Sequence, residues 1–467
     1  MDRGSDRPLV VSATASRSAG EIHDLARRLG EGLAARGVED GMLVGLRTGN
    51  GPAFLTGLLA LRRCRTAAVL LEPSASAGEH LRTLQHLRVA FLLTAPPWAD
   101  GRDAFRLERA LPPDTEPRRV GIDVAVVKLT SGTTGQPRGI TTPSEALMAD
   151  DDQLARSMGL VADERILAAV PMSHSYGLSS VALPALVRGS TLVVPEAGSP
   201  FSGLQLARRC DITFLPTSPA FLTALVRTSS APPLPPSLRR VISAGALLPP
   251  DTARAFRRRF GQPVHVFYGA SECGGICYDR DGDAAENGTV GAPVEGVRVT
   301  IEPQQDGDAT GLLVVESAAV AHGYLPHADS RLGHGQFRTG DLARWSAGAI
   351  ELAGRVDDLI NVRGRKVNPR EVERVLLAHP AVLEAVAFKV EDGTAGERLR
   401  AIAACSPSTA TREELLAWCR HHLAEFKVPR SLLIVDRLPR TERGKPDRAA
   451  LLRLEPEDAA SPRRSFA

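Results

Sequence analysis

Apolar residues recur with two different periods along the chain, and the two periods alternate. Between Ala19 and Arg36 they return every three or four residues, which predicts an amphipathic helix that Gly37 ends. Short runs rich in β-branched residues and leucine alternate with further helical stretches as far as residue 268. Strands are predicted at 42–46, 67–71, 124–127, 166–170, 191–194, 212–215, 240–243 and 264–268, and helices at 52–62, 176–188, 219–227 and 251–260. This alternation is typical of a doubly wound, mostly parallel sheet.

The pattern changes after Glu272. Short apolar segments broken by glycine, at 297–301, 312–315 and 349–352, predict a small β-barrel or antiparallel sheet. From about residue 358, helices at 369–378 and 411–422 and strands at 383–389, 399–404 and 431–435 predict an α+β unit. We therefore expect an α/β fold: a large N-terminal domain with doubly wound sheets and a small barrel, followed by a small α+β C-terminal domain.

Composition narrows the function classes. With 467 residues, 43% hydrophobic and 24% charged, the chain has the balance of a globular protein with several domain-sized units. A net charge of +3 gives no electrostatic reason to expect nucleic acid or an anionic membrane as a partner. No apolar stretch approaches the ~18 residues of a membrane span, and the six cysteines are scattered. We expect a cytoplasmic protein, monomeric or homodimeric, with reduced thiols.

The segment from Lys128 to Gly139 carries the clearest chemical signal. Its glycines let backbone N–H groups approach anionic oxygens, its hydroxyls add donors, and Arg138 adds charge. The spacing is not that of a Walker A loop. A Ser/Thr/Gly cluster is often only a surface turn, but here a β-branched strand, residues 124–127, leads into it, as in a loop that binds ATP phosphates.

Further motifs follow in a fixed order. They are 171–177 (Pro-Met-Ser-His-Ser-Tyr-Gly), 242–246 (Ile-Ser-Ala-Gly-Ala), 268–272 (Tyr-Gly-Ala-Ser-Glu), 337–342 (Phe-Arg-Thr-Gly-Asp-Leu), 354–358 (Gly-Arg-Val-Asp-Asp) and 439–445 (Pro-Arg-Thr-Glu-Arg-Gly-Lys). Together they resemble the ordered motifs of the adenylate-forming superfamily of acyl-CoA synthetases, adenylation domains and luciferases. The resemblance extends from about residue 18 to 451. It implies that a carboxylic acid and MgATP give an acyl-adenylate and pyrophosphate, after which the acyl group passes to a nucleophile.

The resemblance implies a nucleotide site. Tyr268 matches the residue that stacks on adenine, Asp341 the carboxylate that accepts the ribose hydroxyls, and Glu272 the carboxylate on Mg²⁺, with Thr133 as a further metal ligand. The family more often has lysine where this chain has Arg138. The full set of cofactor-binding residues that it implies is Thr130, Ser131, Gly132, Thr133, Thr134, Arg138, Ala244, Gly245, Ala246, Tyr268, Gly269, Ala270, Ser271, Asp341 and Arg355.

The resemblance also implies the catalytic groups and the domains. Lys445 matches the mobile lysine that reaches the acid and the α-phosphate, and His174 and Arg355 are the other catalytic candidates. An ATP- and acid-binding domain would comprise residues 1–354, a hinge 355–357 with Asp357 at its centre, and a mobile C-terminal domain 358–467.

The substrate is less sharply defined. Relatives that activate amino acids have an aspartate near His174 that pairs with the α-ammonium group; here His174 and Ser175 are uncharged at neutral pH, which disfavours an α-amino acid. The segment resembles that of aryl-acid ligases, with His174, Ser175, Gly245 and Gly269 around the acid. A medium-chain fatty acid is the alternative. For the acceptor we expect a thiol, either CoA or the phosphopantetheine of an acyl carrier protein, with an amine or other small nucleophile as the alternative.

Two other functional classes are compatible with an adenylate-forming fold. A luciferase-like oxidative enzyme shares the adenylation step, but no feature of the sequence supports it. An ATP-binding protein without activity would be expected to lack Glu272, Asp341 or Lys445, and the chain has all three.

Overall fold

A computed structural model describes residues 6–131, 137–196, 201–303, 309–362, 365–392, 396–406, 409–439 and 447–454. The contacts within the chain divide it into two compact units. Unit 1 comprises Met1–Thr300, Val314–Thr339 and Ser346–Ile350, and unit 2 comprises Ile301–Leu313, Gly340–Trp345 and Glu351–Ala467.

Unit 1 contains a seven-stranded sheet whose centre is parallel. Its strands, in spatial order, are β18 (Gly323–Leu325), β8 (Pro137–Pro143), β7 (Val124–Ser131), β4 (Ala67–Leu70), β3 (Leu43–Arg47), β5 (Phe91–Thr94) and β6 (Arg106–Arg109). Strands β7, β4, β3 and β5 run parallel, whereas β18, β8 and β6 pair in the antiparallel sense. The associated helices are α1 (Ala19–Ala35), α2 (Pro52–Arg63) and α3 (Ala77–Leu87), with a 3-10 turn at Arg102–Ala104. Helix α2 contacts β3, β4 and α1.

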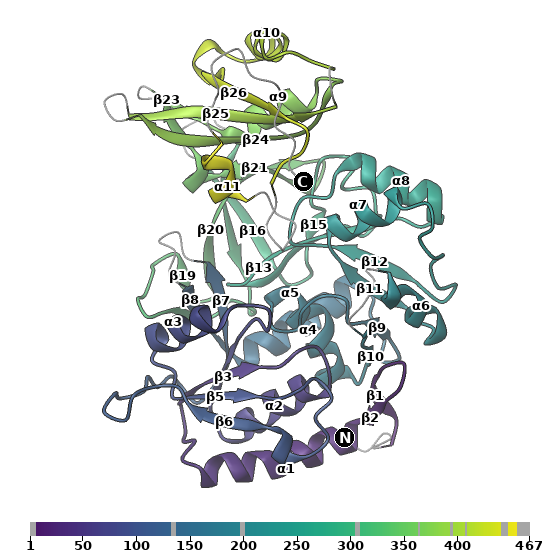
Figure 1. Cartoon of the computed structure of the whole chain (residues 1–467), viewed down its shortest axis with the longest axis vertical. Coiled ribbons are helices and arrows are strands. Elements are labelled where there is room, and N and C mark those ends of the chain that lie inside the picture. The colour runs from purple at the N-terminus through teal and green to yellow at the C-terminus, as the bar shows by residue number, and fades with distance from the viewer. Residues whose placement is uncertain are drawn as a thin grey trace. The chain divides into compact units, whose positions relative to one another are not determined.

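A second sheet in unit 1 has nine strands. In order they are β15 (Ala292–Pro293), β14 (Gly274–Tyr278), β13 (His265–Ala270), β12 (Arg240–Ser243), β11 (Phe214–Thr217), β9 (Arg165–Leu167), β10 (Thr191–Val193), β1 (Pro8–Val11) and β2 (Ser16–Ser18). The strands from β13 to β1 are parallel to one another. Helices α6 (Ser202–Arg209), α7 (Pro219–Arg227) and α8 (Pro250–Phe260) connect them, and α7 packs on α8 (Figure 1).

Helix α4 (Ser144–Met158) joins the two sheets of unit 1. It contacts β14 of the nine-stranded sheet and β7 and β8 of the seven-stranded sheet, so it lies between them. The neighbouring stretch was predicted as one helix, 176–188. It is instead α5 (Ser175–Gly177) followed by two π-helical segments, Leu178–Ala182 and Pro184–Arg188. Pro184 has no N–H to donate within the helix, which is consistent with this irregular geometry.

Unit 2 contains a three-stranded sheet covered by helices, drawn in green to yellow in Figure 1. Strands β24 (Val382–Asp392) and β25 (Gly396–Cys405) are antiparallel, and β26 (Ser431–Val435) is parallel to β25. The remaining elements are the hairpin of β22 (Ile360–Val362) and β23 (Arg365–Val367), the helices α9 (Pro369–Leu377), α10 (Arg412–His422) and α11 (Arg448–Leu452), and 3-10 turns at Val356–Asp358 and Glu425–Lys427. Helix α9 contacts β24, and α10 contacts α9.

Later in the sequence than the parallel strands come strands whose residues are divided between the two units. They are β16 (Arg298–Pro303), β17 (Gly311–Glu316), β20 (Gln336–Ser346) and, over Ala349–Arg355, β21; β19 (Leu332–Gly333) pairs with β20 inside unit 1. The predicted fold class, parallel-rich α/β sheets followed by a small α+β unit, is confirmed. The small barrel and the domain limits at 354 and 358 stay predictions. No helix in the described part of the chain is long and apolar enough to cross a membrane.

Candidate functional site

Several predicted motifs meet at one edge of the nine-stranded sheet. Strands β11, β12 and β13 are parallel, so the segments that follow them leave the sheet at the same edge. The hydroxyl of Tyr176 fixes the motif around α5 to this edge: it accepts a hydrogen bond from the Thr217 N–H (3.0 Å) and donates one to the Ile242 carbonyl (3.4 Å). Burial raises the pKa of Tyr176 well above its usual value, so the hydroxyl stays protonated.

The next motif is attached to the same place by Ser175. Its hydroxyl donates to the Ser271 hydroxyl at 2.7 Å, which puts the start of α5 beside the residues that precede Glu272. Next to Ser175, the imidazole Nε2 of His174 contacts the carboxylate of Glu72. A cavity of about 210 Å³ adjoins this pair and is lined by Asn50, Glu72, Pro73, Ala169, Pro171 and Ser173. The predicted acid-binding residues His174 and Ser175 thus lie beside the predicted nucleotide residue Ser271.

Glu72 is a partner that the sequence patterns did not indicate. Burial of its carboxyl group raises the pKa, but the hydrogen bond from His174 and the charge of His174 outweigh burial and lower the pKa of Glu72 to about 2. The side chain of Glu72 is 17% exposed, so the contact is partly shielded from water. Glu72 is therefore an anion at neutral pH, and its carboxylate holds the imidazole ring of His174 in place.

Glu72→Gln is expected to flatten the acid dependence of stability. The folded-state pKa of Glu72, about 2, lies below its ordinary value of 4.5, so its contribution is present above pH 4.5 and is lost as the pH falls toward 2. Between about pH 5 and about pH 3 the urea midpoint of the wild type should fall more steeply than that of the variant. Parallel pH profiles would show that His174 does not stabilise the Glu72 anion.

The predicted adenine-binding segment has an open backbone surface. Gly245 has φ +86°, a left-handed conformation that disfavours any side chain, and no atom lies within 4 Å of where a Cβ would be. Two residues before Gly245, Ser243 pairs with Val266 of β13, and Tyr268 on that strand is half-buried. At Gly269 a Cβ would be 2.6 Å from the Gly274 carbonyl oxygen, so only glycine lets β13 and β14 approach this closely.

The phosphate loop begins and ends on paired strands. Thr130 pairs with Arg138 in the β7–β8 hairpin. Gly132, Thr133 and Thr134 lie outside the described residues, as does the side chain of Ser131.

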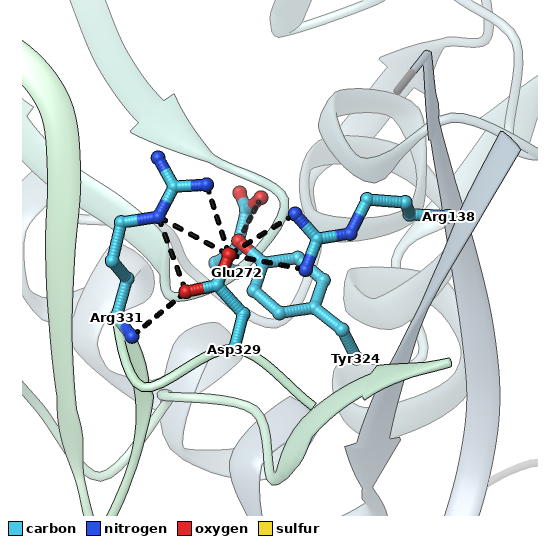
Figure 2. A network of polar contacts seen from close by, with 5 residues as sticks. All are labelled: Arg138, Glu272, Tyr324, Asp329 and Arg331. Atoms are coloured by element: carbon cyan, nitrogen blue, oxygen red, sulfur yellow. Dashed lines mark hydrogen bonds and ion pairs between the residues drawn. The ribbon is translucent and has the colours of Figure 1, made fainter. Parts of the chain in front are cut away.

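The Arg138 side chain, at the end of the loop, is held on two sides. Its guanidinium lies 3.7 Å from the centre of the Tyr324 ring, and its Nη1 and Nη2 atoms each donate to Asp329 at 3.2 Å (Figure 2).

Glu272 belongs to the same network. The Tyr324 hydroxyl donates to Oε1 of Glu272 at 2.9 Å (Figure 2). The backbone carbonyl of Glu272 accepts from the Ala321 N–H at 2.8 Å. Within the described ranges, no group of three or more His, Cys, Asp or Glu side chains is arranged to hold a metal ion. A single carboxylate with hydroxyls nearby in sequence fits Mg²⁺, which binds through one or two carboxylates, substrate phosphates and water.

A buried polar cluster lies behind Glu272, and sequence reasoning missed it. Asp150, on α4, accepts hydrogen bonds from the Ser179 hydroxyl at 2.5 Å and the Gly275 N–H at 2.9 Å. Lys128, on β7, is 3% exposed. Burial lowers the pKa of Lys128, and the charge of Asp150 opposes that shift; burial likewise raises the pKa of Asp150. The signal available in the sequence was Lys128, a charged residue that directly follows the apolar run 124–127.

Two predicted nucleotide residues lie together in unit 2. Arg355, at the end of β21, has its Nε atom 3.8 Å from Oδ1 of Asp341 on β20, and the Asp341 side chain is 20% exposed. Asp357 is in the 3-10 turn Val356–Asp358, and its hinge role stays a prediction. Lys445 lies outside the described residues.

A second cavity shares Pro73 with the first. It has a volume of about 460 Å³ and contains none of the predicted site residues; it is lined by Arg47, Thr48, Gly49, Pro73, Thr94, Ala95, Pro96, Asp103, Ala104 and Arg106.

The chain belongs to the AMP-binding enzyme family. The family's model matches residues 1–325, and the model of the C-terminal domain of AMP-binding enzymes matches residues 371–445. The recognised resemblance to adenylate-forming enzymes is thereby confirmed.

Individual relatives have named acid substrates. Feruloyl-CoA synthase from Amycolatopsis sp is 31% identical, over 93% of this chain and 94% of the relative. Sulfoacetate–CoA ligase from Cupriavidus necator is 28% identical, over 96% of this chain and 94% of the relative. Among solved structures, o-succinylbenzoate CoA synthetase from Bacillus subtilis, in complex with its acyl-adenylate intermediate, has a TM-score of 0.80 at 26% identity and covers 97% of this chain and 96% of its own.

Proposed function

We propose that this protein activates a carboxylic acid with ATP and then transfers the acyl group to a thiol. The observation that carries the proposal is the convergence, in unit 1, of Arg138, Ser175 and the adjacent pair Ser271 and Glu272 from three segments that are distant in sequence. These are the residues that the family motifs assign to phosphate, acid and metal binding. Membership of the AMP-binding enzyme family supports the same assignment.

In the adenylation step, a carboxylate oxygen of the acid attacks the α-phosphorus of ATP. The bond from the α-phosphorus to the β-phosphate oxygen breaks, and pyrophosphate leaves with that electron pair. Arg138 and the phosphate loop hold the charge of the leaving pyrophosphate, and Lys445 reaches the α-phosphate and the acid. Glu272 and Thr133 would hold Mg²⁺, which would supply further charge neutralisation. The remaining roles are the stacking of Tyr268 on adenine and the hydrogen bonds of Asp341 and Arg355 to the ribose.

For the acid we propose an aryl acid. His174, held by Glu72, would lie beside its carboxylate, and Ser175 would donate to a ring substituent. The names of feruloyl-CoA synthase and o-succinylbenzoate CoA synthetase support an aromatic acid, whereas sulfoacetate is not aromatic. A medium-chain fatty acid, the alternative left open by the sequence, stays the competing substrate class.

For the acceptor we propose CoA or the phosphopantetheine of an acyl carrier protein. Transfer would form a thioester and release AMP as the thiolate attacks the acyl carbon. Asp357 would serve as the hinge between the adenylation and transfer states. The CoA ligases among the relatives support a thiol acceptor, with CoA as the direct candidate.

Pyrophosphate exchange tests the first step directly. The purified full chain is assayed with MgATP and panels of benzoates, cinnamates, fatty acids and amino acids; exchange driven by benzoates or cinnamates is the expected result. Exchange driven only by amino acids or only by fatty acids would overturn the aryl-acid assignment. Exchange with none of the acids, in a chain that does not bind MgATP, would overturn the proposed function.

The second step is tested with the best acid from that panel. Product analysis compares CoA, a carrier protein bearing phosphopantetheine, a simple amine and no acceptor. A thioester with either thiol is expected. Amide formation alone, or hydrolysis alone in all four mixtures, would contradict a thiol acceptor.

A further inference from the structure

We propose that Tyr324 and Asp329 are positioning residues that orient Arg138 and Glu272 for MgATP before the nucleotide binds. The inference rests on the proposed function, because it takes Arg138 as a phosphate ligand and Glu272 as a metal ligand. Neither Tyr324 nor Asp329 is part of the motifs on which the family resemblance depends. Both lie in unit 1, on the segment between β17 and β19.

Asp329 fixes one edge of the Arg138 guanidinium. Nη1 and Nη2 of Arg138 each donate to Oδ2 of Asp329 at 3.2 Å, and Arg331 holds the same carboxylate with Nη2 at 2.9 Å from Oδ2 (Figure 2). Hydrogen bonds from Arg331, and a weaker one from Arg138, hold the pKa of Asp329 well below its usual range, although burial opposes them. Asp329 is therefore an anion at any pH at which the enzyme would work.

Tyr324 connects the two functional groups. Its ring lies under Arg138, with 3.7 Å from the guanidinium carbon to the ring centre, and its hydroxyl donates to Oε1 of Glu272 at 2.9 Å. Tyr324 is 8% exposed, and its strand pairs with β8 so that Tyr324 is opposite Ile140, two residues from Arg138.

This arrangement leaves both functional groups with atoms for ligands. A guanidinium has five N–H donors, and Asp329 takes two of them from Arg138, so the others can reach a phosphate oxygen. Glu272 receives Tyr324 at one carboxylate oxygen, and its second oxygen can bind a cation. Arginine suits this position better than lysine because a planar guanidinium can stack on the ring and donate to a carboxylate at once.

Substitution of the two residues is expected to change different quantities: the Mg²⁺ dependence of ATP binding for Tyr324, and the ATP affinity itself for Asp329. Tyr324→Phe keeps the ring under Arg138 and removes the hydroxyl from Glu272, so ATP binding without Mg²⁺ should stay unchanged. The Mg²⁺ concentration for half-maximal enhancement of ATP binding should rise about 10-fold or more, the effect of one lost charge-assisted hydrogen bond. Asp329→Asn loosens the guanidinium and should weaken ATP binding about 5-fold to 10-fold with or without Mg²⁺.

Calorimetric titration of the full chain with ATP, with and without Mg²⁺, measures both effects without an acid substrate. Glu316→Gln is the matched control, since Glu316 pairs with Arg298 on an exposed surface, at 3.4 Å, and should leave both quantities unchanged. Thermal midpoints show whether each variant is folded, and a purely structural role would not change the Mg²⁺ dependence selectively.

Each outcome decides between the two hypotheses. A wild type that does not bind ATP would overturn the proposed function itself. Wild-type binding combined with an unchanged Mg²⁺ dependence in Tyr324→Phe, or with equal or tighter ATP binding in Asp329→Asn, would overturn the positioning role and leave the proposed function standing.

Discussion

Lys445→Ala is expected to lower the rate of acyl-adenylate formation by about 100-fold or more, while ATP binding changes little. The ammonium would neutralise charge that accumulates between the carboxylate of the acid and the α-phosphate only as the transition state forms. A group that acts in this way contributes to kcat far more than to ground-state affinity. Pyrophosphate exchange measures the rate, and calorimetric titration with MgATP measures the affinity.

A control from the same segment makes the Lys445 result specific. Arg443→Ala removes a positive charge two residues away that the family motif does not assign to catalysis, and it should leave exchange within a few-fold of the wild type. Transfer from a preformed acyl-adenylate should also continue in Lys445→Ala, because the lysine is assigned to the first half-reaction. Exchange close to the wild-type rate in Lys445→Ala would show that another cation does this work.

Elements with strong local signals were predicted with correct bounds. Helix α7 occupies Pro219–Arg227, as predicted: Pro219 fits the first helical turn, and Ser218 caps it by accepting from the Phe221 N–H at 3.4 Å. Helix α4 was missed because the run Asp150–Asp152 interrupts the apolar period. Asp150 is nevertheless buried, and its hydrogen bonds to Ser179 and Gly275 offset the cost of burying its carboxyl group. The helix was missed because the period of apolar residues along one segment gives no information about contacts with distant segments.

Helix α3 is a different failure, since its signal was present. Ser76 and Glu79 form a capping box: the Glu79 N–H donates to the Ser76 hydroxyl at 3.3 Å, and the Ser76 N–H donates to the Glu79 carboxylate at 2.8 Å. The Ser-x-x-Glu pattern at this position could have located the helix.

Only the residues of the candidate site that lie within recognisable sequence motifs could be predicted. Arg138, Ser271 and Glu272 could be named because each lies in a recognisable segment. Asp329 is 191 residues from Arg138 in sequence, and its contact depends on the pairing of β18 with β8, which no local pattern reveals. Glu72 is likewise 102 residues from its partner His174, so a single sequence gave no basis for pairing them.

Asp341→Ala is expected to lower kcat/KM for ATP by about 100-fold and to abolish discrimination between ATP and its deoxy analogues. In the proposed site the Asp341 carboxylate accepts both ribose hydroxyls. Each hydrogen bond to a charged group contributes about 1.5–3 kcal/mol, so the loss of two corresponds to about a 100-fold effect or more. Asp341 is 20% exposed and has Arg355 Nε 3.8 Å from Oδ1, so the carboxylate is already oriented by a cation in unit 2.

The same hydrogen bonds can also be removed by changing the nucleotide instead of the protein. This comparison distinguishes a loss of ribose binding from a general loss of folding. The wild type should use 2′-deoxyATP and 3′-deoxyATP about 10-fold less well than ATP, since each analogue lacks one donor. Asp341→Ala should use all three nucleotides equally, because the acceptor for both hydroxyls is gone and the two losses are not additive. Glu413→Ala, an exposed carboxylate on α10, should keep the wild-type preference. If Asp341→Ala still preferred ATP over both analogues by the wild-type factor, the ribose would be bound by other groups, and Asp341 would serve only to hold Arg355 beside it.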